Sequence, residues 1–383
     1  DGTGLAAIGG ETSASSEGRQ TSWHFLGNIE EVQIYSGVLS QTDLDVLRTR
    51  ARNCGVVGPE HIELVHNGAA LNCTPKAVTV LACTGSASCN GVPASQYTGG
   101  SFTFTPTPIS GAQWCSDALC ASPISGAVTL SNNATIYLRE PTARTDTLGG
   151  STSSASNATV QCTNAATSAF NATTACEVAF ASAGFLMNAA NHYACSPQIM
   201  TLQAVKSSAT GTSCIPAFAG VNRDVKLYLS YTNPATGIQT ASLNYVTSSG
   251  GASSAVASLS TSSGSPSTLG ALYFDGTGTA TISNFSYPDA GQVMLNPSYT
   301  GSAGTGDAGL SLVAISGNSF IAAPKSFVFS AIPTAPLTAG DPFNVTVTAY
   351  NACSTPASTP NFGRETTAAT VSLTSSNPIP AMG

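Results

Sequence analysis

Charged side chains are scarce in this chain: 12 lysines and arginines and 19 aspartates and glutamates make up only 8% of its 383 residues. A typical globular protein carries about 25%. The net charge of -7 excludes the basic surface that most nucleic-acid binders present to phosphates. Ordinary disorder is excluded too, because it needs low hydrophobicity and high net charge, whereas 42% of these residues are hydrophobic.

Long apolar runs are also missing. The longest runs, such as Val78–Cys83, fall far short of the roughly 20 residues that span a bilayer, so we expect no membrane span. Helical patterning is limited to one stretch that begins near Ser40 and fades near Arg52. The chain starts at Asp1 without a signal peptide and stops at Gly383 within a strand-and-turn pattern, which predicts a piece of a longer protein.

Catalytic motifs are the third absence: the sequence has no nucleophile elbow, zinc-protease helix or phosphate-binding loop. Glu30 and Glu31 are adjacent on a predicted strand, so they point to opposite faces rather than forming a carboxylate pair. His61 and His66 flank a strand start and a turn, where a packing or surface role is favoured. We therefore predict a protein that is not an enzyme and that has no cofactor.

Two Asp-Gly-Thr-Gly strings, which begin at Asp1 and Asp275, offer one acid each. A calcium ion needs about six or more oxygen ligands, usually from several acids, so hairpin turns are favoured over calcium loops. No metal site is predicted from these strings.

Eleven cysteines are what the chain does have. No C-x-x-C pair occurs, and only His192 lies near a cysteine in sequence, so disulfides are favoured over zinc. Disulfides imply an oxidising compartment. The preferred local pairs are Cys83–Cys89, Cys115–Cys120, Cys162–Cys176 and Cys195–Cys214. The odd number leaves Cys54, Cys73 and Cys353 over, and a rival pairing joins Cys73 to Cys89.

Short alternating strands fill the rest of the chain, with Gly, Ser, Asn and Pro between them, which predicts antiparallel sandwiches. In the first region the expected strands are Ile62–Val65, Ala77–Cys83, Ser101–Thr105, Ala127–Leu130, Thr135–Leu138, Val178–Phe180 and Phe185–Met187. In the second they are Ile199–Val205, Val225–Tyr231, Ala241–Val246, Thr279–Phe285, Val293–Leu295 and Leu310–Ile315. Two Ser/Gly-rich stretches, Asp146–Asn157 and Thr247–Thr268, are expected to be exposed loops.

An internal repeat supports tandem domains. The string Cys73–Val80 resembles Cys195–Leu202, and Phe180–Gly184 resembles Tyr287–Gly291. We therefore predict one sandwich over residues 54–190, a second over 191–323 and the start of a third, incomplete one over 324–383. The fold class expected is all-β, with tandem Ig-like antiparallel β-sandwiches.

Two sets of motifs resemble known families. The strand Gly27–Tyr35, followed by Leu39 and Ser40, resembles the end of a laminin-G/concanavalin-like jelly roll, whose last part would then be residues 1–53. The second set is, in chain order, His61–Gly68, Leu71–Pro75, Val78–Cys83, Val178–Leu186, Leu202–Val205, Cys214–Phe218, Tyr231–Gly237, Tyr287–Gly291 and Thr359–Arg364. With these strings, residues 55–383 resemble the C-terminal region of MshQ-like proteins, a family associated with biogenesis of the mannose-sensitive haemagglutinin (MSHA) type IV pilus.

The resemblance implies an exported protein of a Gram-negative cell surface, with no catalytic residues to carry over. The expected function is an extracellular structural or adhesion protein of MSHA-like type IV pili or a surface filament. Its expected partners are its own copies or pilus subunits. The alternative is a carbohydrate-binding, lectin-like module that binds surface glycans. Trp23 is the candidate glycan contact for that alternative, although a core position is favoured for it.

Overall fold

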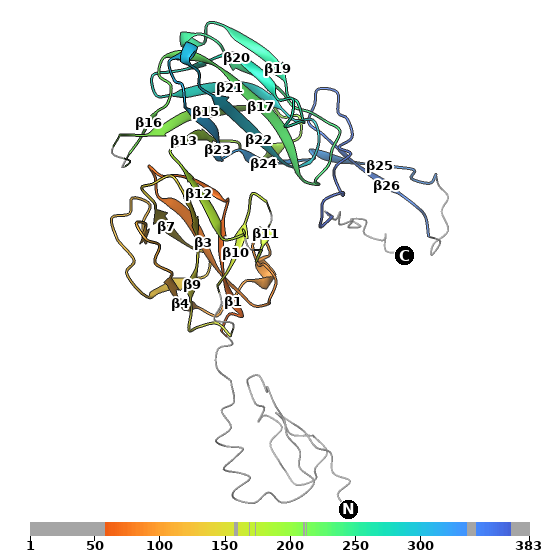
Figure 1. Ribbon diagram of the computed structural model, residues 1–383. Helices are drawn as coiled ribbons and strands as arrows, with labels where there is room; N and C mark the ends of the chain where they lie inside the picture. The colour runs from red at the N-terminus through yellow and green to blue at the C-terminus, as the bar shows by residue number, and fades with distance from the viewer. Residues whose placement is uncertain are drawn as a thin grey trace, which may run out of the picture. The chain divides into compact units, whose positions relative to one another are not determined.

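The computed structural model describes residues 58–156, 160–167, 169–172, 174–209, 211, 213–334 and 342–368 (Figure 1). The chain divides into two compact units, Asp1–Val57 and Gly58–Gly383, and every described residue belongs to the second. The predicted jelly-roll end, the short helix, Trp23 and Cys54 lie outside the described residues. Among the described residues, no helix is long and apolar enough to cross a membrane.

A six-stranded sheet forms one layer of the first sandwich, in the order β11-β10-β1-β3-β7-β5. Its strands are β1 (His61–His66), β3 (Lys76–Cys83), β5 (Gln113–Cys115), β7 (Ala134–Arg139), β10 (Val160–Asn164) and β11 (Ala169–Phe170). β1 pairs antiparallel with β3 and parallel with β10. Both central strands are buried along most of their length, and β1 buries the polar His61, Glu63 and His66 together with its apolar residues.

Two three-stranded sheets, β2-β12-β8 and β6-β4-β9, complete the first sandwich. Their strands are β2 (Ala69–Leu71), β4 (Ser101–Pro106), β6 (Val128–Ser131), β8 (Thr145–Thr147), β9 (Gly150–Ser151) and β12 (Glu177–Ala181). Alternation along β4 buries Phe102 and Phe104, which join Trp114, Ile136 and Leu138 in one apolar core. A 3-10 helix, η1 (Pro93–Ser95), lies between β3 and β4.

The second sandwich is built from longer strands, which hydrogen-bond into one connected set of twelve. These are β13 (Ala183–Met187), β14 (His192–Tyr193), β15 (Gln198–Ser207), β16 (Cys214–Pro216), β17 (Val221–Asn233), β18 (Ser242–Val246), β19 (Ser254–Ser258), β20 (Ser267–Phe274), β21 (Thr279–Ser286), β22 (Gly291–Thr300), β23 (Ser311–Ser316) and β24 (Ser319–Ala323). Two 3-10 helices, η2 (Ser249–Gly251) and η3 (Ala303–Thr305), lie in the connections.

Strand β23 links the two layers of this second sandwich. It pairs antiparallel with β22 and parallel with β13, so the ladders of the two layers become continuous along that side. The core between the layers is apolar and rich in aromatic rings, including Phe185, Phe274, Phe285 and Phe320. Beyond it, β25 (Ser326–Ser330) and β26 (Thr346–Tyr350) form a two-stranded antiparallel ribbon.

The predicted all-β class is confirmed, and three details differ from expectation. Asp146–Asn157 is not one exposed loop, because β8 and β9 reach into it and Asp146, Leu148 and Thr152 are buried. β13 pairs with β15, so the second set of strands begins at Ala183, before the boundary expected at residue 190. Thr247–Thr268 is not one loop, because Ser254–Ser258 pairs with β18 along its whole length as β19. The small side chains of β19 give a weak strand signal in the sequence, but the backbone ladder to β18 overrides that local preference.

Candidate functional site

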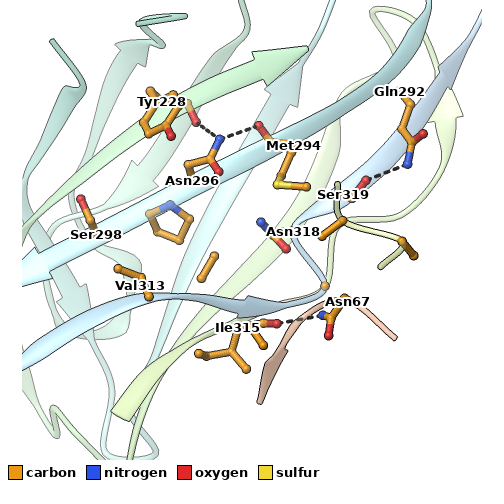
Figure 2. A pocket seen from close by; sticks show the side chains of 16 residues that line it. Asn67, Tyr228, Gln292, Met294, Asn296, Ser298, Val313, Ile315, Asn318 and Ser319 are labelled. Carbon is orange, nitrogen blue, oxygen red and sulfur yellow. Dashed lines mark hydrogen bonds between the residues drawn. The ribbon is translucent and has the colours of Figure 1, made fainter. Parts of the chain in front are cut away.

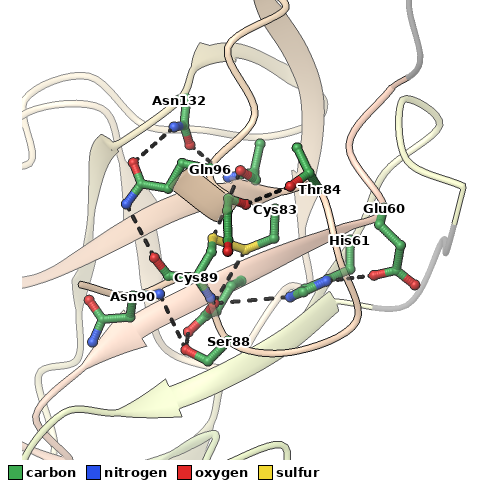
Figure 3. The surroundings of a disulfide bond; sticks show 12 residues. Glu60, His61, Cys83, Thr84, Ser88, Cys89, Asn90, Gln96 and Asn132 are labelled. Atoms are coloured by element: carbon green, nitrogen blue, oxygen red, sulfur yellow. Dashed lines mark hydrogen bonds and ion pairs between the residues drawn. A yellow bond between two sulfur atoms is a disulfide. The ribbon is translucent and has the colours of Figure 1, made fainter. Parts of the chain in front are cut away.

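A buried polar cluster lies where β1 and β3 meet the loop that follows β3 (Figure 3). The strand register places His61 directly opposite Cys83, and Glu63 lies two residues along the same face of β1. His61, Glu63 and Cys83 are all fully buried. Cys83 is bonded to Cys89, so the loop between them folds back over Glu63.

The Glu63 carboxylate is held by donors from two directions. Its Oε2 accepts a hydrogen bond from the Cys89 backbone N–H at 2.9 Å. Its Oε1 accepts one from the Ser88 hydroxyl at 2.7 Å and a second from the Thr163 hydroxyl of β10. These donors account for a charged group without solvent exposure, because a buried carboxylate is tolerated only when it is hydrogen-bonded.

His61 is fixed by a carboxylate on one side only. Its Nδ1 donates to Glu60 Oε2 at 2.7 Å, because a carboxylate can only accept. Its Nε2 has no hydrogen-bond partner among the described residues and lies 4.0 Å from Glu63 Oε2. Cys83 Sγ lies 3.3 Å from that same oxygen. Potential ligand atoms of His61, Glu63 and Cys83 all lie within 4.8 Å of one another. Among the described residues, these three could together hold a metal ion.

Sequence reasoning missed this cluster. His61 and Cys83 are far apart in the chain, and the search for zinc ligands relied on short spacings. Antiparallel pairing of the two expected strands Ile62–Val65 and Ala77–Cys83 could have revealed it. This pairing places the start of the first strand, near His61, beside the end of the second, at Cys83.

A cavity of about 520 Å³ opens between residues of both sandwiches (Figure 2). The alternation of β22 turns Gln292, Met294, Asn296 and Ser298 toward it and buries Val293 and Leu295 in the core. Asn67 of the first sandwich reaches the cavity wall and donates to the Ile315 carbonyl at 2.9 Å. None of the residues lining the cavity is charged, so it suits a neutral ligand.

Two amides of the cavity wall donate to backbone carbonyls. Asn296 Nδ2 donates to the Met294 carbonyl at 3.2 Å, and Asn318 Nδ2 donates to the Leu295 carbonyl at 2.9 Å. Because a carbonyl oxygen can only accept, the amide nitrogen makes each of these contacts. These two hydrogen bonds do not use the side-chain oxygens of Asn296 and Asn318, which are acceptors.

The junction between the two sandwiches is closed by a disulfide, Cys73–Cys214. Leu71, Cys73, Val205 and Ile315 form a small apolar cluster around it. The expected pair Cys195–Cys214 is therefore wrong, as is the rival pair Cys73–Cys89. The first pair was expected from its spacing along the chain and the second from the repeat, but a disulfide joins residues that meet in space.

A second junction disulfide, Cys195–Cys353, ties the second sandwich to the segment that carries β26. The same segment reaches a buried site at the turn before β22, where Asp289 accepts from the Asn361 backbone N–H at 3.1 Å. Burial raises the pKa of Asp289. Three of the motif strings, those around Tyr231, Tyr287 and Asn361, meet at this point. Burial, with the Asp289 charge, raises the pKa of both tyrosines, and Tyr287 and Asn361 are buried.

The remaining site predictions have plain outcomes. The three local disulfides Cys83–Cys89, Cys115–Cys120 and Cys162–Cys176 are present. Trp114, the second tryptophan, is buried in the first core and donates to the Thr107 carbonyl at 3.0 Å. Asp275 accepts from the backbone of Thr277 and Thr279, so its string forms a hairpin turn. These hydrogen bonds, together with one from the Thr277 hydroxyl, lower the pKa of Asp275.

Two family models match the chain. Residues 159–315 match "Domain of unknown function (DUF6701), first Ig-like domain", and residues 60–156 match "Domain of unknown function (DUF8613)". The second sandwich therefore corresponds to an Ig-like domain, as predicted. A comparison with curated proteins finds no match. A solved structure titled "Marsupial T cell receptor" is 9% identical, with 70% of this chain and 78% of that chain covered, at a TM-score of 0.17.

The five disulfides indicate an extracytoplasmic compartment, because such bonds persist where the environment is oxidising.

Proposed function

We propose that this chain is an extracellular structural and adhesion protein, a non-enzymatic spacer of MSHA-like type IV pili or of a cell-surface filament. The observation that carries the proposal is a disulfide across each junction: Cys73–Cys214 between the sandwiches and Cys195–Cys353 beyond the second. A covalent bond at each joint is what a load-bearing series of domains needs. The resemblance to MshQ-like proteins supports the link to pili.

The sequence separations show how much chain these bonds withhold from a pulling force. Cys73 and Cys214 are 141 residues apart, a length that would extend to roughly 480 Å at about 3.4 Å per residue. The separation of Cys195 and Cys353 is larger still, at 158 residues. Pulling on the oxidised chain therefore cannot unravel either sandwich to its full length.

Contacts beside each disulfide keep the joints from swivelling. At the first joint, Asn67 donates to the Ile315 carbonyl at 2.9 Å, and the Ser207 hydroxyl donates to Asn72. At the second, Asn351 donates to the Pro288 carbonyl at 2.8 Å. Neutral amides and hydroxyls make these contacts, in keeping with a chain that has few charges.

Single-molecule stretching of the full chain tests the proposal. We expect full reduction to lengthen the unfolded chain by at least roughly 480 Å relative to the oxidised chain. The matched control, C115A/C120A, opens a loop of 5 residues that lies within the Cys73–Cys214 loop, so it should add no length while Cys73–Cys214 is intact. A chain that reaches its full contour length while oxidised would contradict a load-bearing role.

A second function, binding of neutral glycans, is favoured by the amide-lined cavity. Its wall combines acceptor oxygens with the apolar Met294 and Pro297, which is the mixture that holds a sugar ring. Glycan-array binding should be lost in N296A and kept in N244A, an asparagine outside the cavity on β18. Equal binding by the two variants would exclude the cavity as a sugar site.

A further inference from the structure

The cluster around Cys83 has the parts of a tetrahedral metal site. Zinc is held by sulfur at about 2.3 Å, by histidine nitrogen at about 2.0–2.1 Å and by carboxylate oxygen at about 2.0–2.2 Å, so neighbouring ligand atoms lie roughly 3.4–3.8 Å apart. Here Cys83 Sγ is 3.3 Å from Glu63 Oε2, and His61 Nε2 is 4.0 Å from that same oxygen. These separations are already close to the edges of such a tetrahedron.

The contacts behind the ligand atoms follow the pattern found around bound zinc. A ligating histidine usually donates its other ring N–H to a carboxylate, and ligating carboxylates are themselves hydrogen-bonded. His61 Nδ1 donates to Glu60, so the buried Nε2, which has no hydrogen-bond partner among the described residues, is the ring nitrogen left to bind an ion. Ser88 and Thr163 hold Glu63 by Oε1, which turns Oε2 toward Cys83 and His61.

The missing ligand is a second thiolate, and Cys89 supplies it when the disulfide opens. We propose that reduction of Cys83–Cys89 creates a zinc site made of both cysteines, His61 Nε2 and Glu63 Oε2. A dithiol reductant gives two electrons and two protons to the disulfide and becomes a disulfide itself. Zinc then displaces the two thiol protons, so that two thiolates, one carboxylate and one neutral imidazole surround it.

Electrostatics favour the exchange. The zinc ion brings two positive charges beside a carboxylate that the fold has already buried. The ion also meets the free Nε2 of His61, a buried polar atom with no hydrogen-bond partner among the described residues. The loop from Cys83 to Cys89 thus has two stable closures, a disulfide or a shared metal ion.

The Cys115–Cys120 disulfide is a matched control within the chain, because it also closes a short loop. The acid in that loop, Asp117, is exposed and already accepts from the backbone N–H groups of Leu119, Ala121 and Ser122. Both sulfurs lie near the Gln113 carbonyl, at 3.7 and 3.8 Å, rather than near a histidine. Opening this disulfide gives two thiols without the other two ligands.

The test uses the full chain, reduced with dithiothreitol and desalted without oxygen. Cobalt(II) is the probe, since tetrahedral thiolate coordination gives it a visible and near-ultraviolet absorption spectrum. We expect one cobalt ion per chain, displaced by zinc, with the spectrum lost in C83A/C89A and kept in C115A/C120A. H61Q, E63Q and the outer-contact variant E60Q should each bind about 10–100-fold more weakly.

Thiol alkylation with mass mapping gives an independent readout when other disulfides also open. Zinc should slow alkylation of Cys83 and Cys89 at least about tenfold and leave Cys115 and Cys120 unprotected. Binding by H61Q and E63Q within twofold of the unchanged chain would overturn the proposal, because it would mean that thiols of an unfolded chain bind the ion. Equal protection of both cysteine pairs, or no cobalt spectrum, would overturn it as well.

Discussion

The two sandwiches reach stability by different means. The first has short strands, the longest being β3 with 8 residues, and it contains three disulfides within itself. The second has strands of up to 13 residues and a larger apolar core. Across the described residues, both disulfides of the second sandwich lead outward to a neighbouring part of the chain.

The difference follows from how much apolar surface each sandwich can bury. A small domain buries a smaller fraction of its surface, and cross-links then compensate by restricting the unfolded chain. The first sandwich also buries many polar groups, including His61, Glu63, His66, Glu140 and Asp146. Asp146 and Glu140 share Arg144 as a partner, and burial, with the Glu140 charge, raises the pKa of Asp146. Its stability should therefore depend on redox state and pH more than that of the second.

The largest effect should come from the core of the second sandwich. Phe285 is fully buried and packs edge-on against Phe320, with ring centroids 5.3 Å apart. F285A should lower the free energy of unfolding by about 3–5 kcal/mol, because it leaves a cavity. I199S is the control, since Ile199 on β15 is 75% exposed and should change stability by less than about 0.5 kcal/mol. Urea denaturation measures both, and equal losses would contradict a core-dependent sandwich.

The next-largest effect should come from removal of a disulfide of the first sandwich. Cys162 and Cys176 close a loop of 14 residues, so C162A/C176A should cost about 3 kcal/mol through the added entropy of the unfolded chain. Hydrogen exchange resolved by peptide should show faster exchange in β10 and β12 and little change in β21. A uniform increase along the chain would mean that the two sandwiches unfold as one unit.

The smallest predicted effect is a difference in response to acid. Burial lowers the pKa of His66 to about 4, below its ordinary value of 6.5, so the unfolded chain takes up a proton first as pH falls. The first sandwich should lose about 2 kcal/mol between pH 7.5 and pH 5. Asp289 of the second sandwich has a raised pKa, so the folded chain binds its proton first. Its contribution to the free energy of unfolding therefore increases as pH falls toward 3.8.

Urea titrations at several pH values, followed by Trp114 fluorescence, would report the first sandwich because Trp114 lies in its core. H66Q should flatten the profile. A slope that is unchanged in H66Q would assign the acid sensitivity to another group.

Periodicity in the sequence predicted about half of the strands that the structure describes. In β4 and β22 the alternation of apolar and polar residues matches the alternation of burial. It missed longer strands such as β20, and it failed where side chains are small, as in β19, and where strands have only two or three residues, as in β9 and β16. A ladder of backbone hydrogen bonds forms there regardless of the side chains, so no pattern in the sequence reports it.

The sites were harder to predict than the strands. Local disulfides followed from short spacings, whereas Cys73–Cys214 and Cys195–Cys353 depend on which strands meet. Trp23 and the jelly-roll end remain predictions. The cavity wall was not predicted either, since Asn296 lies in β22 and Asn318 in the turn between β23 and β24, and their neighbourhood depends on the pairing of β22 with β24.

The order of the cysteines along the chain has a consequence for biogenesis. Three of the bonds join neighbouring cysteines and can form as soon as each pair emerges into an oxidising compartment. Cys73 must instead wait for Cys214 while six other cysteines of the local pairs follow it. An oxidase that pairs cysteines as they appear would join Cys73 to Cys54, the cysteine before it in the sequence. Efficient maturation of this protein therefore requires a disulfide isomerase, and its yield should fall sharply in cells that have oxidase but lack isomerase.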